Sequence, residues 1–275
     1  MRRKRVPKVE DNMPIKTPSP SVFRPEHGVD REVLDESKAL IEAIDRRKIL
    51  KGAFSLGALS MLTGCDVTDK SAVQTLLKSV SNFNDSVQQL LFRPNHLAPT
   101  YKEADVVKPP RYNAYYEIEE VEPVDGASWK LELSGLIQDR KSWTAGQIAQ
   151  LPEQEMIIRH ICVEGWDYIG QWSGVNLGEY LKLVGADTKA KYVYFKCADG
   201  YSGTIDMATA LHPQTILATK YAKAPITDPF GFPLRLRTAT KLGYKNPKWI
   251  TAMEVTNNYP GGYWEDRGFN WFGGI

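Results

Sequence analysis

The sequence has little cysteine and lacks the common motifs that attach or bind redox cofactors. Only three cysteines occur in 275 residues, Cys65, Cys162 and Cys197. A disulfide-stabilised secreted scaffold uses more cysteines in a shorter chain, and a four-cysteine iron–sulfur site needs one more. No Cys-x-x-Cys-His or Gly-x-Gly-x-x-Gly pattern is present. Covalently attached c-type haem and a dinucleotide fingerprint are therefore excluded within this chain.

Strong net charge is also missing. The formal charge is +2, with the basic excess confined to residues 1–64. The remainder is mildly acidic, which argues against a general nucleic-acid surface. A zinc site from Cys162, Cys197, His160 and His212 is disfavoured because no closely spaced pair of ligands exists.

Long hydrophobic runs are absent as well. The longest uncharged apolar run, Gly52–Gly64, has 13 residues and is too short to span a bilayer as a helix. It follows the pair Arg46-Arg47 and ends at Leu62-Thr63-Gly64-Cys65. The arrangement resembles a twin-arginine export signal with a lipobox, and a buried core helix is the alternative. We therefore expect an export signal over residues 1–64 with a long basic leading region, a lipidated Cys65 and a periplasmic location.

A helical linker segment is predicted over residues 65–107. Apolar residues recur every three or four positions between Ser71 and Phe92, and Pro94 follows. We expect this helix to pack against the domain behind it rather than bind a partner. The domain itself is predicted over residues 108–275.

The fold of that domain is predicted as α+β. Strand-like segments end at Ser134, Cys162, Cys197, Tyr221, Arg237 and Val255. Short helices begin after capping residues at Thr144, Asn176 and Asp206. Strands that alternate with short helices favour a mixed sheet.

The stretch Arg159–Trp166 stands out among these segments. The apolar run before it predicts a buried strand that ends near Cys162, so that the thiol is presented where the strand opens into a loop. Arg159 and His160 precede the thiol, and positive charge nearby would lower its pKa. A lone cysteine among apolar residues is otherwise a small core side chain.

The same octapeptide resembles the segment that carries the molybdenum-ligating cysteine in sulfite-oxidase-like molybdopterin enzymes. Within that family the chain is most similar to the catalytic subunits of protein-methionine-sulfoxide reductases. The resemblance covers about half the chain, from Pro109 to Val255. The Cys-Ala-Gly-Asn motif and the extra C-terminal domain of sulfite oxidases proper are missing, which favours the reductase side.

The resemblance implies a set of site residues. Cys162 would ligate molybdenum, with Glu164, Arg159 and His160 beside it in the reaction site. Glu164 would share a strand face with Cys162, and a pairing with Arg159 or His160 is the alternative. The positions implied to hold the cofactor are Asn113, Tyr116, Glu117, Cys197, Arg235, Lys245, Asn246 and Lys248. The alternatives for these are an aromatic edge strand around Asn113 and a solvated basic face around Lys245.

The resemblance further implies a molybdenum-cofactor-dependent oxidoreductase in the cell envelope. The expected reaction is oxygen-atom transfer at sulfur, of the sulfoxide reductase type, with electrons from a membrane haem protein or cytochrome. Sulfite dehydrogenase-type oxidation is the first alternative. A non-catalytic, lipid-anchored binding protein is the alternative from another class.

Overall fold

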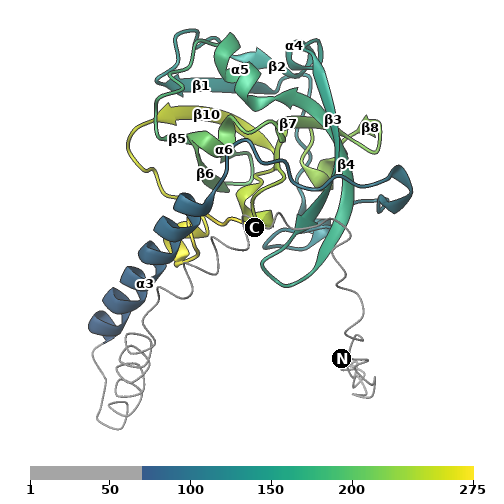
Figure 1. Ribbon diagram of the computed structural model, residues 1–275. Helices are drawn as coiled ribbons and strands as arrows, with labels where there is room; N and C mark the ends of the chain where they lie inside the picture. Colours follow the sequence, from purple (N-terminus) through teal and green to yellow (C-terminus); the bar gives the residue numbers. More distant parts are fainter. Residues whose placement is uncertain (1–69) are drawn as a thin grey trace, which may run out of the picture. The chain divides into compact units, whose positions relative to one another are not determined.

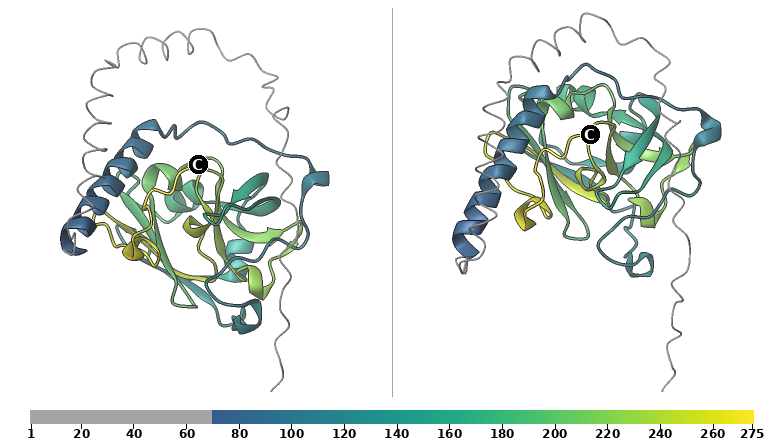
Figure 2. Two further views of the ribbon diagram at one scale, coloured as in Figure 1. Left: turned by 90° about the horizontal axis from the view of Figure 1, so that it is seen from below. Right: turned by 60° about the horizontal axis from the view of Figure 1, so that its bottom comes forward.

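The computed structural model describes residues 70–275. The predicted export signal, its arginine pair and Cys65 lie outside these residues. Within them, two β-sheets pack face to face, with short helices at their edges and one long helix beside the C-terminal segment (Figures 1 and 2).

The first sheet has the strand order β2-β1-β10-β5-β6. β1 and β10 run parallel, with Glu132 opposite Ala252, and the other neighbours are antiparallel. This is the mixed sheet that the sequence predicts. Its strands are β1 (Lys130–Gly135), β2 (Trp143–Thr144), β5 (Tyr192–Cys197), β6 (Ser202–Asp206) and β10 (Ile250–Thr256).

The second sheet is entirely antiparallel. Its path is β3-β4-β7-β8, and β9 also pairs with β7. Its strands are β3 (Glu153–Ile161), β4 (Asp167–Asn176), β7 (Thr215–Tyr221), β8 (Ala224–Pro225) and β9 (Arg235–Thr238). β4 lies between β3 and β7, and it is a strand that the sequence did not reveal.

Short helices connect the strands where capping residues predict them. α4 (Ala145–Ala149), α5 (Leu177–Leu183) and α6 (Met207–Ala210) each begin after a side chain that accepts a backbone N–H three residues on. These three predictions are confirmed. The 3₁₀ turns are η3 (Glu103–Asp105), η4 (Ile118–Glu120), η5 (Asp228–Phe230), η6 (Gly243–Lys245) and η7 (Glu265–Arg267).

The main core lies between the two sheets. Leu131 and Phe195 of the first sheet are fully buried in the same cluster as Leu217 and Leu236 of the second. Fully burying such a side chain stabilises the fold by about 1.5–3 kcal/mol. Because β3 and β9 belong to this packed frame, the residues at their ends are held in fixed positions.

The long helix α3 (Lys70–Leu91) confirms the helix predicted between Ser71 and Phe92. Its packing differs from the expectation, because polar Asp85 and Gln88 make its hydrogen bonds to the domain. Among the described residues, no helix is both long enough and apolar enough to cross a membrane.

Candidate cofactor site

Cys162 stands at the end of β3, as predicted. The strand stops at Ile161, and Cys162 opens a short loop back to β4. Its N–H donates to the Trp166 carbonyl at 2.9 Å, and the Gly165 N–H donates to the Cys162 carbonyl at 3.1 Å. Gly165 has a φ of 89°, which favours glycine. The loop therefore fixes the thiol rather than leaving it on a mobile segment.

The thiol faces a cavity of about 180 Å³. Three segments far apart in the sequence form its walls: the loop after β3, the segment around Asn113, and the loop from η6 into β10. Trp264 and Phe269 add aromatic surface from the C-terminal region. The predicted site residues among the lining are Asn113, Cys162, Glu164, Asn246 and Lys248.

Two polar side chains approach the Cys162 sulfur. The Asn113 amide nitrogen lies 3.9 Å from Sγ, and Sγ lies 3.7 Å from Glu164 Oε2. The Trp166 indole N–H donates to the same carboxylate oxygen at 2.7 Å. Glu164 is therefore at the cavity, but it belongs to a turn and not to the strand face that we expected. It pairs with neither Arg159 nor His160.

The prediction of a lowered Cys162 pKa is wrong for the cofactor-free protein. Burial raises the pKa of the thiol, because the thiolate would lose solvation. The half-exposed Arg159 guanidinium pairs with Asp167 instead of approaching the sulfur. Burial, reinforced by Arg237, holds the pKa of His160 well below its usual range, so its ring is neutral. A coordinating metal would deprotonate the thiol regardless of these neighbours.

Arg235, Arg237 and Lys248 form a group of buried cations beside the cavity. Their exposed fractions are 3%, 1% and 8%, and none pairs with a carboxylate within residues 70–275. Burial lowers the pKa of each, and that of Lys248 falls to about 7. Burying an unpaired cation is unfavourable, so the charge and burial of this group suit an anion.

Trp172 of β4 lies under the two arginines. The guanidinium carbons of Arg235 and Arg237 lie 4.6 and 5.6 Å from its ring centroid. Arg237 also donates to the Asn246 side-chain oxygen at 2.8 Å, which ties β9 to the loop that carries Lys248. The Nε atoms of both arginines lack a hydrogen-bond partner, as does His160 Nδ1.

Arg237 is a site residue that the sequence reasoning missed. It follows Arg235 by two positions on a strand, so both side chains point to the same face. That spacing was the available signal. Gly243 was missed too: a Cβ there would lie 2.8 Å from His160 Nε2 and 3.2 Å from the Asn113 amide nitrogen. The glycine lets the η6 loop close against the cavity wall.

Other predicted site residues lie outside the cavity lining. Tyr116 donates to Asp199 at 3.1 Å, and Glu117 is the exposed N-cap residue of η4. The segment around Asn113 is irregular, so the alternative of an edge strand is also wrong. Cys197 ends β5 and is buried, and burial raises its pKa well above the usual range.

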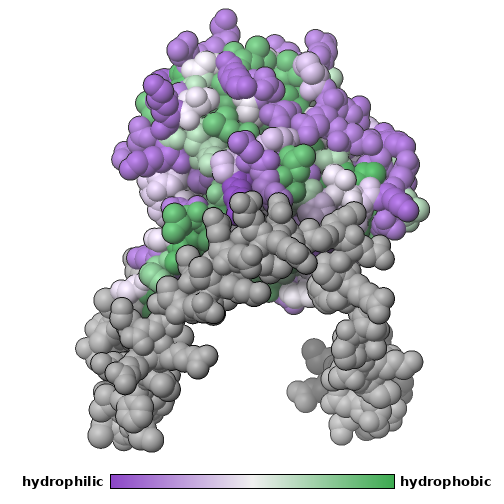
Figure 3. Space-filling view, viewed as in Figure 1, coloured by the Kyte–Doolittle hydropathy of each residue, from purple (hydrophilic) through white to green (hydrophobic). Residues whose placement is uncertain are grey.

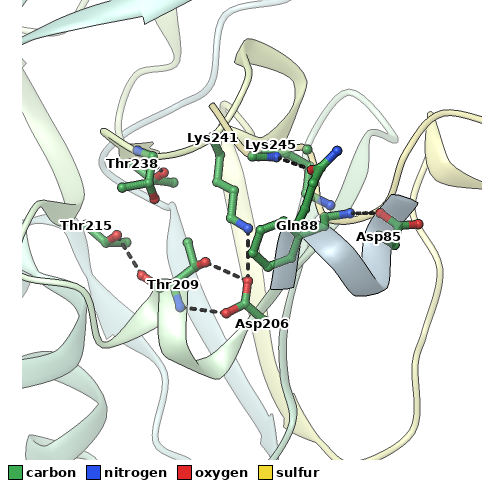
Figure 4. A network of polar contacts seen from close by, with 12 residues as sticks. Asp85, Gln88, Asp206, Thr209, Thr215, Thr238, Lys241 and Lys245 are labelled. Carbon is green, nitrogen blue, oxygen red and sulfur yellow. Dashed lines mark hydrogen bonds and ion pairs between the residues drawn. The ribbon is translucent and has the colours of Figure 1, made fainter. Parts of the chain in front are cut away.

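Lys245 requires a correction. Its side chain is 1% exposed, and its ammonium pairs with Glu265 on the side of the loop that faces α3 rather than the cavity (Figure 4). Because Glu265 already balances the charge of Lys245 and Lys245 does not line the cavity, we replace Lys245 by Arg237 in the predicted anion site. The solvated basic face, the alternative for this region, is wrong because Lys245 and Lys248 are both buried.

The model of the family "Oxidoreductase molybdopterin binding domain" matches residues 118–264. The chain belongs to this family. It is thus a molybdopterin-binding oxidoreductase, and the α+β fold with a mixed sheet agrees with that assignment.

Relatives of this molybdopterin oxidoreductase carry reductase names. A putative protein-methionine-sulfoxide reductase subunit YedZ1 from Azospira oryzae is 53% identical over 89% of this chain and 95% of its own length. The protein-methionine-sulfoxide reductase catalytic subunit MsrP from Xanthomonas campestris pv. campestris is 31% identical over 56% of each chain. The chain thus spans little more than half of MsrP. Sulfane dehydrogenase SoxCD from Paracoccus pantotrophus shows a weak structural likeness, with a TM-score of 0.47 and 16% identity over 50% of this chain and 40% of its own.

The residues present suit the family's cofactor. Molybdopterin offers sulfurs to the metal at one end and a phosphate at the other. The protein offers a soft thiol at Cys162 and unpaired buried cations in the same region. No cluster of three or more His, Cys, Asp or Glu side chains within residues 70–275 could hold a metal alone. Cys162 is the cysteine that lines the cavity.

Proposed function

We propose that the protein is a molybdenum-cofactor-dependent sulfoxide reductase of the cell envelope, with methionine sulfoxide as the class of substrate. The observation that carries the proposal is the position of Cys162 on a cavity whose wall includes Lys248, with Arg235 and Arg237 packed behind it. The names of the similar reductase subunits support the choice of substrate.

The cofactor would supply two-electron redox chemistry and the transfer of an oxygen atom. The chain's own residues bind and orient it. Cys162 would provide the thiolate ligand, and Arg235, Arg237 and Lys248 would bind the phosphate. The amides of Asn113 and Asn246 face the cavity and suit the polar edge of a pterin.

Reduction of a sulfoxide to a sulfide and water takes up two electrons and two protons. Glu164 is the titratable side chain nearest the sulfur of Cys162 that is both on the cavity and exposed. We assign it the role of holding a proton for the departing oxygen. The aromatic rings of Trp264 and Phe269 on the same cavity suit the methyl and thioether groups of methionine.

The electrons would come from an external carrier, a membrane haem protein or cytochrome. Arg46-Arg47, the apolar run and Cys65 support twin-arginine export to the periplasm and a lipid anchor. The segment over residues 65–107 would link that anchor to the cofactor domain over residues 108–275.

The test uses the full chain purified from a host that makes the cofactor. With a reduced dye as electron donor, methionine sulfoxide should oxidise the dye, and sulfite with an oxidised acceptor should react slowly or not at all. Fast sulfite oxidation without sulfoxide turnover would favour the dehydrogenase. If elemental analysis finds no molybdenum in this preparation, that result would favour the non-catalytic binding protein.

A further inference from the structure

The helix α3 contacts the domain through its polar face. Asp85 is 3% exposed, and its Oδ1 accepts the Phe272 N–H at 3.0 Å. One turn further on, Gln88 Oε1 accepts the Gly274 N–H at 3.1 Å. Figure 4 shows Asp85 and Gln88 pointing from the helix into this polar network. An amphipathic helix normally buries its apolar stripe, so this orientation is inverted.

The apolar stripe of α3 consequently points to solvent. Its members are spaced three or four residues apart and are opposite Asp85 on the helix. Leu90 is 84% exposed and Phe83 67%, and apolar side chains are visible along α3 in Figure 3. We call this surface the outward face of α3, made of Val80, Phe83, Val87, Leu90 and Leu91. A contiguous exposed apolar surface of this kind marks an interaction site.

The outward face continues past the end of the helix. Leu91 lines a hollow of about 380 Å³ together with Phe92, Arg93 and Ile275. Ile275 is itself 53% exposed. The apolar surface therefore runs from α3 onto the C-terminal residue.

The described part of the outward face carries little charge. Among residues 79–100, Arg93 is basic and exposed, and Asp85 is acidic. Asp85 is turned inward and bound to backbone amides, so it adds nothing to the outer surface. Apolar side chains along the helix, with Arg93 beyond its end, suit the surface of a bilayer whose headgroups meet the cation.

The chain that leads into α3 points to the same occupant. The uncharged run Gly52–Gly64 and Cys65 precede it in the sequence, and Lys70 follows Cys65 by five residues. Five residues span at most about 18 Å. A chain held at a bilayer at Cys65 would therefore keep α3 within reach of the lipid headgroups.

We propose that the outward face of α3 lies in the plane of a lipid bilayer and binds its surface without crossing it, an inference that rests on the proposed location in the cell envelope. This contact would also orient the cofactor domain. The C-terminal segment that α3 binds through Phe272 and Gly274 is joined to the loop before Gly243, because the Leu242 N–H donates to the Gly273 carbonyl at 2.8 Å. Leu242 directly precedes Gly243 of the cavity wall.

Vesicle flotation tests the proposal. The full chain carries Cys65→Ala, which removes the predicted acylation site, and the vesicles contain phosphatidylcholine with phosphatidylglycerol. Phe83→Gln with Leu90→Gln should weaken binding by at least about tenfold, because each side chain loses its apolar transfer to lipid. The matched control changes two exposed polar positions of the same helix, Asn82→Ala with Gln89→Ala, and should bind as the parent does.

Helix content and molybdenum content should be the same in the parent, the double variant and the control. Phe83 and Leu90 are exposed, so replacing them should not disturb folding. Equal binding by the Phe83→Gln, Leu90→Gln protein would overturn the proposal and assign the affinity to the residues before α3. Absence of vesicle binding by the parent would overturn it as well. A dimer that Phe83→Gln and Leu90→Gln dissociate, or binding that requires a membrane protein in the vesicles, would assign the face to that occupant instead.

Discussion

Replacing Lys248 by Met should raise the free energy of unfolding of the cofactor-free protein. The same change should weaken binding of the cofactor. The Lys248 ammonium lies 4.1 Å from the Trp249 ring centroid and 4.6 Å from that of Tyr112, with no carboxylate paired to it within residues 70–275. Methionine keeps the length and the favourable contact with aromatic rings but carries no charge.

The size of the effect follows from the Lys248 pKa. Burial, assisted by Arg235, lowers it from 10.5 to about 7. Folding therefore disfavours the charged form, at a cost of up to about 4 kcal/mol at neutral pH. The free energy of unfolding of the cofactor-free protein should rise as the pH increases from about 7 toward 10.5, and Lys248→Met should remove that part of the rise.

For cofactor binding, Lys248→Met should be unfavourable. A charged hydrogen bond to a phosphate contributes about 1.5–3 kcal/mol, so its loss should raise the cofactor dissociation constant about 10- to 150-fold. The assays are thermal unfolding of protein made without the cofactor, and molybdenum per chain in protein made with it. Lys241→Met is the control, because Lys241 is also buried with a pKa of about 7 but pairs with Asp206 at 3.1 Å outside the cavity (Figure 4).

Lys241→Met should leave molybdenum loading unchanged. If Lys248→Met destabilises the cofactor-free protein while loading stays complete, Lys248 is an ordinary structural lysine and the anion site is wrongly placed.

Three further changes test separate parts of the account. Arg235→Ala should lower molybdenum content more than thermal stability, since it removes a phosphate donor along with the contact to Trp172 and the 2.8 Å bond to the Phe230 carbonyl; full loading would contradict the assignment. Glu164→Gln should slow sulfoxide turnover at unchanged molybdenum content, because an amide cannot give up a proton as a carboxyl group does; undiminished turnover would remove Glu164 from proton transfer. Arg46→Lys with Arg47→Lys should keep the chain in the cytoplasm, and export of this variant would refute the twin-arginine signal. Cys65→Ala should abolish labelling by a radioactive fatty acid, and continued labelling would refute acylation at Cys65.

Local patterns in the sequence predict much of this fold. The helix caps at Thr144, Asn176 and Asp206 and the strand before Cys162 depend on neighbours in the chain, and all are confirmed. β4 escaped detection because its glycines interrupt the apolar pattern. Gly174 is needed there, since a Cβ would lie 2.0 Å from the Leu217 carbonyl oxygen of β7.

The directions of the charged side chains could not be predicted in the same way. The sequence places Lys245 and Lys248 three residues apart, but only the fold pairs the first with Glu265, twenty residues later, and leaves the second at the cavity. The stripe on α3 predicts an amphipathic helix without saying which face meets the domain. Asp85 decides that, because its carboxylate meets backbone amides near residue 272.

The central claim is that Cys162 binds molybdenum and makes the protein a sulfoxide reductase. X-ray absorption at the molybdenum edge, on the same samples used for dye-linked turnover of methionine sulfoxide, tests both halves. Cys162→Ser should keep the protein folded, remove one sulfur from the metal's ligands and abolish turnover, because an alkoxide is a harder ligand than a thiolate. An unchanged sulfur shell with full turnover in Cys162→Ser would contradict the account.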